Sequence, residues 1–253
     1  MSRVEHVARQ RAFYDSGAHD HLRARPADPY AEHMAAALAA QVGLQPHHRV
    51  VELGAGFGRF TFALLRHCAA ITAVDLSPRV LEELAGERDA RGIDPSSCQT
   101  LACDVDLLDP ARLDGPIDAV VGFFLLHHLP DVGAALSRLA GLLGPGGGLA
   151  FVEPNRRNPL YLVQIAACPD MHWHEEKGLY RHGVRDYAGL FAGAGLAQVQ
   201  ATTFGFFPPQ VLARSQAAVR LERRLERSRI LKPLLPFVLL SGRATGAAMK
   251  DQR

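Results

Sequence analysis

The sequence has few cysteines and no long apolar run, and each absence excludes a class of protein. Its four cysteines show no Cys-x-x-Cys spacing, so neither a zinc site nor a disulfide framework is expected. No apolar run approaches the roughly 20 residues of a membrane span, and residues 1–21 lack the apolar core of a secretion signal. We therefore expect a cytoplasmic protein with no stable membrane insertion.

The sequence also lacks an excess of either charge. Its 28 Lys and Arg residues nearly balance 26 Asp and Glu residues, for a formal net charge of +2. Phosphate binding usually concentrates many cations on one face, so no nucleic-acid partner is expected. With 253 residues, 48% of them hydrophobic, the chain can fill one large α/β domain with an added lobe. A homodimer is compatible with this composition.

A third absence concerns the glycine-rich stretch that follows the apolar residues 49–53. The dinucleotide pattern Gly-x-Gly-x-x-Gly is missing, because Arg59 stands where its third glycine would be. The glycines present are Gly54, Gly56 and Gly58. Without a Cβ they let the backbone turn tightly and approach a ligand. Asp75, which ends the next apolar run, could accept both ribose hydroxyls or cap the following helix. This pattern predicts an adenosine-type cofactor and argues against NAD.

These stretches resemble the motifs of the class I S-adenosylmethionine (SAM) dependent methyltransferases. Glu52 through Gly58 resembles the first motif of the family, and Ala73 through Ser77 resembles the second. The third motif is matched by Ala102 through Asp104 and the fourth by Asp118 through Leu129. Leu143 through Gly147 resembles the turn before the fifth strand. All five occur in the family's order over about residues 45–205. The resemblance implies SAM as the cofactor.

The resemblance also implies a fold and a set of contacts. The fold is α/β, with a Rossmann-like, seven-stranded, mostly parallel sheet covered by helices on both faces and a last strand antiparallel beside the fifth. We expect a helical cap over 1–45, a SAM-binding core over 46–153, a lid over 154–195 and the completing strands and amphipathic helix over 196–253. Cofactor contacts are expected from Tyr14, Glu52, Gly54, Ala55, Gly56, Gly58, Asp75, Leu76, Asp104, Val105, Phe123 and Phe124.

Several of these contacts have alternatives. Tyr14 is a candidate because a tyrosine in a similar segment of related enzymes folds over the cofactor, but it could equally be a half-buried packing residue. Asp104 has two acidic neighbours, Asp106 and Asp109, that could take its place near the adenine. Phe123 and Phe124 either pack on the adenine or fill the core.

Apolar runs alternate with amphipathic stretches along the chain, which indicates a parallel sheet covered on both faces. Strands are expected at 49–53, 71–75, 98–103, 117–123, 148–153, 198–204 and 237–241, and helices at 4–14, 28–40, 58–68, 78–91, 131–143, 185–194 and 209–231. Ligands of such sheets bind at the carboxyl ends of the strands. The polar residues that follow each strand should therefore converge at one edge.

Three residues at that edge are candidates for catalysis. His127 or His128 could remove a proton from an attacking oxygen or nitrogen, because a histidine pKa lies near neutrality. The alternative is that they cap or orient the following helix. Glu153 ends the neighbouring strand and could orient one imidazole. It could instead bond to Asn155 or Arg156.

Residues 168–185 concentrate aromatic and imidazole side chains and are predicted to form a lid that faces the substrate. Expected substrate contacts are Asn155, His172, Trp173 and Tyr180. No metal is expected, although His172 and His174 could serve as ligands, because methyl transfer needs none. The arginines of the 209–231 helix should face solvent, an acidic substrate or a membrane surface.

The leading prediction is an enzyme that methylates a small apolar or aromatic molecule, such as a natural product, a quinone or a lipid. The small net charge and the aromatic lid favour this class of substrate. A SAM-binding protein that does not methylate is the alternative. A module that has lost its ligand is disfavoured, because every predicted cofactor position holds a suitable residue.

Overall fold

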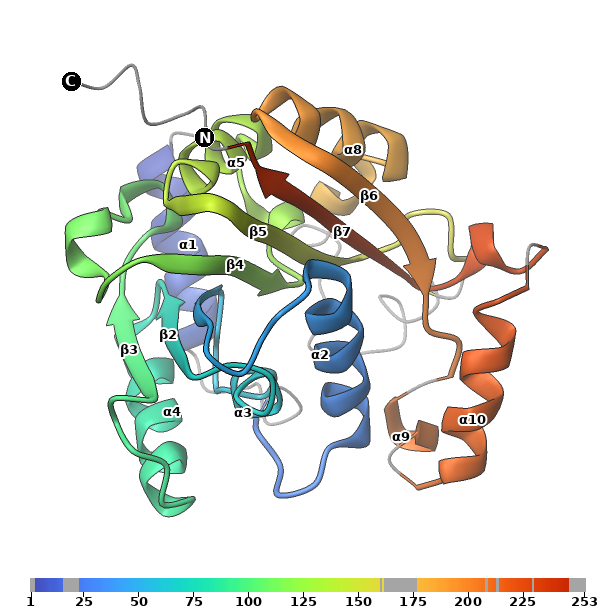
Figure 1. Cartoon of the computed structure of the whole chain (residues 1–253), viewed down its shortest axis with the longest axis horizontal. Helices are drawn as coiled ribbons and strands as arrows, with labels where there is room; N and C mark the ends of the chain where they lie inside the picture. Colours follow the sequence, from blue (N-terminus) through green and yellow to red (C-terminus); the bar gives the residue numbers. More distant parts are fainter. Residues whose placement is uncertain are drawn as a thin grey trace.

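The computed structural model describes residues 3–15, 23–159, 161, 177–207, 209–212, 214–228 and 230–245. Seven strands form one sheet in the order β3-β2-β1-β4-β5-β7-β6 (Figure 1). The strands are β1 (Arg49–Leu53), β2 (Ala70–Asp75), β3 (Cys98–Ala102), β4 (Ile117–Phe123), β5 (Leu143–Pro154), β6 (Leu196–Phe204) and β7 (Phe237–Ala244).

Strands β1 to β5 pair in parallel, whereas β7 runs antiparallel to both β5 and β6. Parallel strands need crossover connections, and most of these are helical here. This arrangement confirms the predicted Rossmann-like α/β fold, including the antiparallel last strand beside the fifth.

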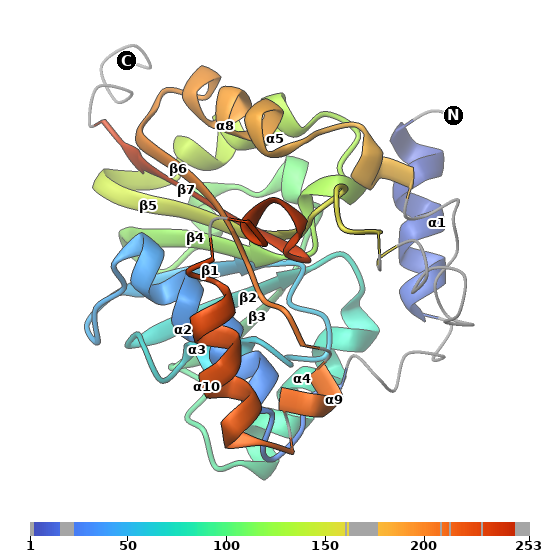
Figure 2. The same cartoon turned by 90° about the vertical axis from the view of Figure 1, so that its right-hand side faces the viewer.

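Two apolar layers hold the helices against the two faces of the sheet. On one face α2 (Pro29–Val42), α3 (Thr61–Leu64) and α4 (Pro78–Ala90) pack through side chains such as Met34 and Leu84. On the other face α5 (Val132–Ala140) and α8 (Val184–Gly193) pack through Leu136 and Phe191. The layers are visible above and below the sheet in Figure 2. Helix α1 (Arg3–Asp15) contacts α4.

Two helices begin at side chains that cap them. Ser77 accepts a hydrogen bond from the N–H of Val80 with Pro78 in the first turn, and Asp131 accepts from Ala134. These side chains satisfy backbone N–H groups that have no partner inside the helix. Among the described residues no helix is both long and apolar enough to span a bilayer.

Three element boundaries differ from the prediction. The helix expected over 58–68 covers only α3, because bonds after Leu64 change from the i+4 to the i+3 type and turn the chain toward β2. Strand β5 begins at Leu143, five residues earlier than expected. The glycine-rich residues 144–148 belong to the strand, where its pairing with β4 shifts in register. The helix expected over 209–231 is two helices, α9 (Pro209–Leu212) and α10 (Gln216–Leu225), because Ser215 caps a new helix.

The connection between β6 and β7 lies at the carboxyl edge of the sheet. Phe204 ends β6 at the level where Phe237 begins β7, and Phe237 also pairs with Pro154 at the end of β5. Helices α9 and α10 therefore lie beyond the edge toward which β4 and β6 point in Figure 1, and Figure 2 shows α10 in front of α2.

Candidate functional site

The glycine turn after β1 leaves open space at one position. A Cβ at Gly56 (φ 51°) would meet no atom within 4 Å, whereas a Cβ at Gly58 (φ 80°) would lie 2.8 Å from Phe62 and 2.9 Å from Leu84. Gly58 is thus required by packing and by its left-handed backbone. Gly54 lies close to Leu125. Gly56 faces the space that a ligand could enter.

Glu52, next to this turn, is a buried acid with capacity for a further partner. Its side chain is 2% exposed, and its Oε2 atom has no hydrogen-bond partner among the described residues. Burial raises the pKa of Glu52 to about 8, against the opposing effect of the neighbouring Thr61 hydroxyl. A buried carboxyl short of partners is costly. It therefore fits a ligand that brings a positively charged group.

Asp75 ends β2 and faces the glycine turn. Its Oδ2 accepts the N–H of Gly56 at 2.9 Å, and its Oδ1 accepts the N–H of Ser77 at 2.9 Å. Burial raises the pKa of Asp75, and these backbone bonds oppose the shift. A carboxylate has about four acceptor positions, so the two bonds hold the side chain in place and leave room for ligand hydroxyls.

The remaining predicted cofactor residues lie along the same edge. Asp104 follows β3, whose Ala102 pairs with Asp75, and its Oδ1 accepts the N–H of Asp106. Leu76 and Val105 are half-buried, and Ala55 is buried with its N–H bonded to β2. Tyr14 lies in α1, but its side chain is outside the described residues. Asp15 beside it accepts a hydrogen bond from Ser77, so the end of α1 reaches the β2 turn.

Six aromatic side chains form a group near the carboxyl ends of β1, β4 and β6 and the amino end of β7. We call Tyr30, Phe60, Phe123, Phe124, Phe204 and Phe237 the aromatic group. Phe123 is 6% exposed and stacks on Phe60 with ring centroids 4.1 Å apart. Phe124 is half-buried, and its φ of 57° is unusual for a residue other than glycine. Its ring lies 5.6 Å from that of Phe237.

His127 and Glu153 form a buried pair. The distance from His127 Nδ1 to Glu153 Oε2 is 2.6 Å, and the side chains are 2% and 0% exposed. Glu153 also accepts backbone N–H groups of Leu125 at 2.9 Å and Leu126 at 2.7 Å. The carboxylate therefore fixes the turn after β4 as well as the imidazole. His128 is half-buried, with its ring 4.0 Å from that of His127.

Predicted substrate residues are distributed differently. Asn155 is 1% exposed, and its amide donates to the carbonyls of Pro233 and Leu235 at 3.1 and 2.7 Å. These bonds join the end of β5 to the start of β7 and favour a structural role for Asn155. Tyr180 is half-buried in a short 3-10 helix, Lys177–Tyr180. His172, Trp173 and His174 lie outside the described residues.

Comparison with known proteins identifies the domain. Residues 51–149 match the family model of the methyltransferase domain. The uncharacterized methyltransferase Rv0089 of Mycobacterium tuberculosis is 37% identical over 123 residues, which cover 47% of this chain and 59% of that protein. This part of the chain is therefore similar to the methyltransferase domains of known proteins. The chain spans about three fifths of the length of the curated relatives it matches.

A second curated protein is similar in sequence, and a solved methyltransferase structure is similar in fold. Ubiquinone biosynthesis O-methyltransferase of Coxiella burnetii is 29% identical over 161 residues, 62% of this chain and 63% of that protein. The structure of magnesium protoporphyrin IX methyltransferase from Synechocystis with bound S-adenosylhomocysteine superposes with a TM-score of 0.63 at 14% identity, covering 93% of this chain and 98% of that one.

The residues present fit SAM, the cofactor that the resemblance to methyltransferases implies. Gly56 leaves open space beside a buried carboxyl of Glu52 that can accept further bonds. The methionine portion of SAM carries an ammonium group, which matches such an acceptor. Asp75, at the end of the neighbouring strand β2, has acceptor positions left for the hydroxyls of a ribose.

A second ion pair, missed by sequence reasoning, joins the glycine turn after β1 to helix α2. Arg59 donates to Asp28 at 2.7 Å, and its guanidinium lies 5.2 Å from the ring centre of Tyr30. Burial alone would raise the pKa of Asp28, but the bond and charge of Arg59 hold it below its usual value. The pair ties the start of α2 to the glycine turn. The sequence showed Asp28 only as the first residue of an expected helix, because its partner is 31 residues away.

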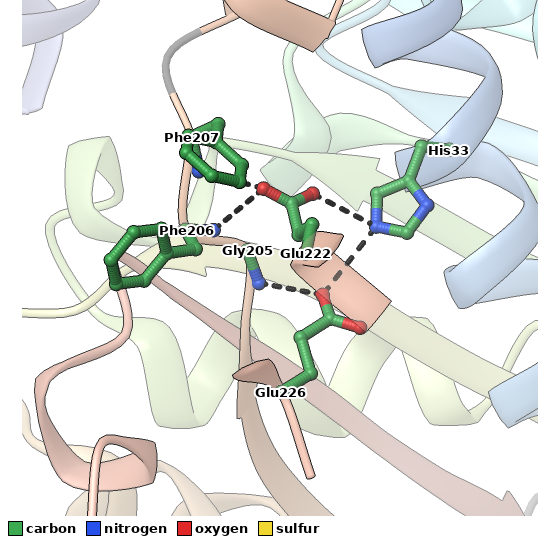
Figure 3. A network of polar contacts seen from close by, with 6 residues as sticks. All are labelled: His33, Gly205, Phe206, Phe207, Glu222 and Glu226. Atoms are coloured by element: carbon green, nitrogen blue, oxygen red, sulfur yellow. Dashed lines mark hydrogen bonds and ion pairs between the residues drawn. The ribbon is translucent and has the colours of Figure 1, made fainter. Parts of the chain in front are cut away.

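Among the described residues one group of side chains could hold a metal ion. The ligand atoms of His33, Glu222 and Glu226 lie within 4.8 Å of one another. Both carboxylates, however, already accept backbone N–H groups, from Phe206 and Phe207 and from Gly205 (Figure 3). We interpret the group as a link between α2 and α10. It was missed because His33 is 193 residues from Glu226.

Proposed function

We propose that the protein transfers the methyl group of SAM to a small apolar or aromatic molecule. Bound SAM supplies a methyl group on a positively charged sulfur, so the chain has mainly to bind it and to align the acceptor. The observation that carries the proposal is the aromatic group beside the glycine turn. Its half-buried members Phe60, Phe124 and Phe237 offer an apolar wall to an acceptor.

Each cofactor residue has a proposed partner. Glu52 accepts from the ammonium of the methionine portion, and Gly56 lets that portion approach the backbone. Asp75 accepts from the ribose hydroxyls, held ready by its bonds to Gly56 and Ser77. Asp104 accepts from the adenine amino group, since it follows the neighbouring strand.

The acceptor side rests on the strained Phe124 and on the relatives. Residues other than glycine with positive φ concentrate at functional sites, where the surrounding structure maintains the strain. The ring of Phe124 lies between those of Phe60 and Phe237. One relative is named for ubiquinone biosynthesis, in keeping with an acceptor of similar chemistry.

We assign the two histidines different roles. His127 is 3% exposed and is held by Glu153. His127 and Glu153 therefore act as positioning residues for the turn after β4. His128 follows on the same turn and is half-buried, which leaves it better placed to reach an acceptor. His128 is therefore the proposed base that takes the proton from an attacking oxygen or nitrogen.

The test is the release of S-adenosylhomocysteine from SAM in the presence of hydroxylated aromatic acceptors, with glycine as a polar comparison. We expect turnover with an aromatic acceptor and none with glycine. We assign Phe124 to the acceptor, although the sequence predicted it as a cofactor contact. Phe124→Leu should therefore raise KM for the acceptor and leave SAM affinity unchanged, whereas Phe206→Leu, at an exposed phenylalanine outside the aromatic group, should change neither. SAM binding without release of product for any acceptor would favour a protein that does not methylate.

A further inference from the structure

The β6–β7 connection, residues 205–235, carries nearly all the exposed large hydrophobic side chains of the described residues. Five of the six are in this segment, and Leu107 is the sixth. Those in the segment are Phe206 (40% exposed), Val211 (40%), Leu221 (46%), Ile230 (86%) and Leu234 (52%). Single exposed apolar residues are ordinary, but a concentration in one segment marks an interaction surface.

The same segment exposes cations. The described basic residues are Arg214, Arg220, Arg223, Arg224, Arg227 and Lys232, and each is exposed. None of them forms an ion pair with another described side chain. On α10 the arginines at 220 and 224 lie one turn apart, with Leu221 beside them on the solvent side. Helices that lie on membranes combine cations and apolar residues in this way.

The acids of the segment do not offset these cations at the surface. Glu222 is 1% exposed, and its Oε1 lies 3.2 Å from His33 Nε2 while its Oε2 accepts two backbone N–H groups. Glu226 is half-buried, with Oε1 3.4 Å from the same nitrogen. Figure 3 shows both carboxylates turned toward His33 on α2. The solvent side of α10 is consequently cationic and apolar.

We propose that residues 205–235 dock the protein on an anionic lipid surface. The cations match anionic headgroups, and the exposed apolar side chains can enter the boundary of the acyl chains. A nucleic acid would match the cations but leave the apolar residues without partners. The segment begins and ends at the carboxyl edge of the sheet, beside the aromatic group. Docking here places the site next to a source of apolar molecules.

Sedimentation with lipid vesicles tests the proposal without SAM or an acceptor, so its outcome is independent of methyl transfer. We expect binding to vesicles of equal parts phosphatidylglycerol and phosphatidylcholine, and little binding to phosphatidylcholine alone. Each cation near an anionic surface contributes about fivefold in affinity. The double variant Arg220→Glu with Arg224→Glu should therefore bind at least about tenfold more weakly.

Two matched controls separate this surface from net charge and from general hydrophobicity. Arg112→Glu with Arg185→Glu changes the charge equally at exposed arginines elsewhere and should bind as the parent does. Ile230→Ser should weaken binding at high salt, whereas Leu107→Ser, at the exposed hydrophobic residue outside the segment, should not.

Three results would overturn the proposal. The first is no binding of the parent protein to the anionic vesicles at low salt. The second is an equal loss of binding in both charge variants, which would indicate an unspecific effect of net charge. The third is that the segment binds another partner but no vesicle. Competition with heparin would show binding to a polyanion, and sedimentation velocity of the parent and of Ile230→Ser would show binding to a second copy of the chain.

Discussion

Glu52 at the glycine turn and Glu222 on α10 are both almost fully buried, but their hydrogen bonds differ. Glu222 accepts the N–H groups of Phe206 and Phe207 and contacts His33. Glu52 keeps one carboxyl oxygen without a partner among the described residues. A satisfied buried acid fixes the structure, whereas an unsatisfied one retains capacity for a ligand. Glu222 therefore belongs to a structural link, and Glu52 belongs to the proposed SAM site.

The largest expected effect concerns the two histidines on the turn after β4. His128→Ala should lower turnover by roughly 10²- to 10⁴-fold with SAM affinity nearly intact, because a base acts only in the transition state. His127→Ala should mainly lower stability, since it breaks the buried pair with Glu153. Single-turnover kinetics and urea unfolding of both variants measure this.

A positioning role for Glu153 has its own test. Glu153→Gln should lower turnover less in a His127→Ala background than in the parent, because the two side chains act together. Equal turnover losses in both backgrounds would show that Glu153 acts independently of His127. Full turnover in both histidine variants would leave positioning alone as the means of catalysis.

The second effect is on cofactor affinity. Asp75→Ala should weaken SAM binding by about 1 to 3 kcal/mol, because it removes a charged acceptor from two hydroxyls. Calorimetric titration measures the change. Asp131→Ala is the matched control, since Asp131 also accepts a backbone N–H group but caps helix α5. Unchanged SAM affinity in a folded Asp75→Ala variant would reduce Asp75 to a structural residue.

The third effect tests the other acid of the comparison. Glu222→Ala should lower the free energy of unfolding by about 1 to 3 kcal/mol, because it leaves buried N–H groups without acceptors. SAM affinity should stay the same. Glu82→Ala, at an exposed position on α4, should change the stability by less than about 0.5 kcal/mol. A loss of SAM affinity in Glu222→Ala would erase the distinction between the two acids.

The smallest effect is a pH dependence from Glu52. Its pKa is about 8 without ligand, above the usual 4.5, and a bound ammonium group favours the carboxylate. SAM binding should therefore release a proton below pH 8, and affinity should rise with pH by at most about tenfold per unit until it levels off near pH 8. Glu52→Gln should remove this slope. A slope that persists in the variant would assign it to another group.

The two regions also differ in how far sequence could predict them. Local patterns predict the glycine turn and the ends of β1, β2 and β4. Asp75, for example, accepts one hydrogen bond from Gly56 on the glycine turn and one from Ser77, two residues further along the chain. The connection formed by α9 and α10 depends on contacts with α2, such as that of Glu226 with His33, 193 residues away in the sequence. The apolar periodicity therefore predicted one helix over 209–231 instead of two. Glu222 faces inward, because His33 and backbone N–H groups bind it.

Within the site, residue types were easier to predict than their partners. Two adjacent strand ends allowed Glu153 to pair with one of the two histidines, as one of two alternatives, but did not indicate which histidine. The three backbone N–H groups on Glu153 could not be predicted, because they depend on the shape of one turn. Asn155 was expected to meet substrate because it follows a strand. Its bonds to residues 233 and 235 come from a segment with no visible motif.

The central claim is that the glycine turn, Glu52 and Asp75 form a SAM site. Calorimetric titration of the protein with SAM and, separately, with NAD tests it most directly. We expect SAM to bind at least about tenfold more tightly, because Arg59 stands where a dinucleotide site needs its third glycine. Equal affinities for the two molecules, or no heat of binding with SAM, would contradict the account.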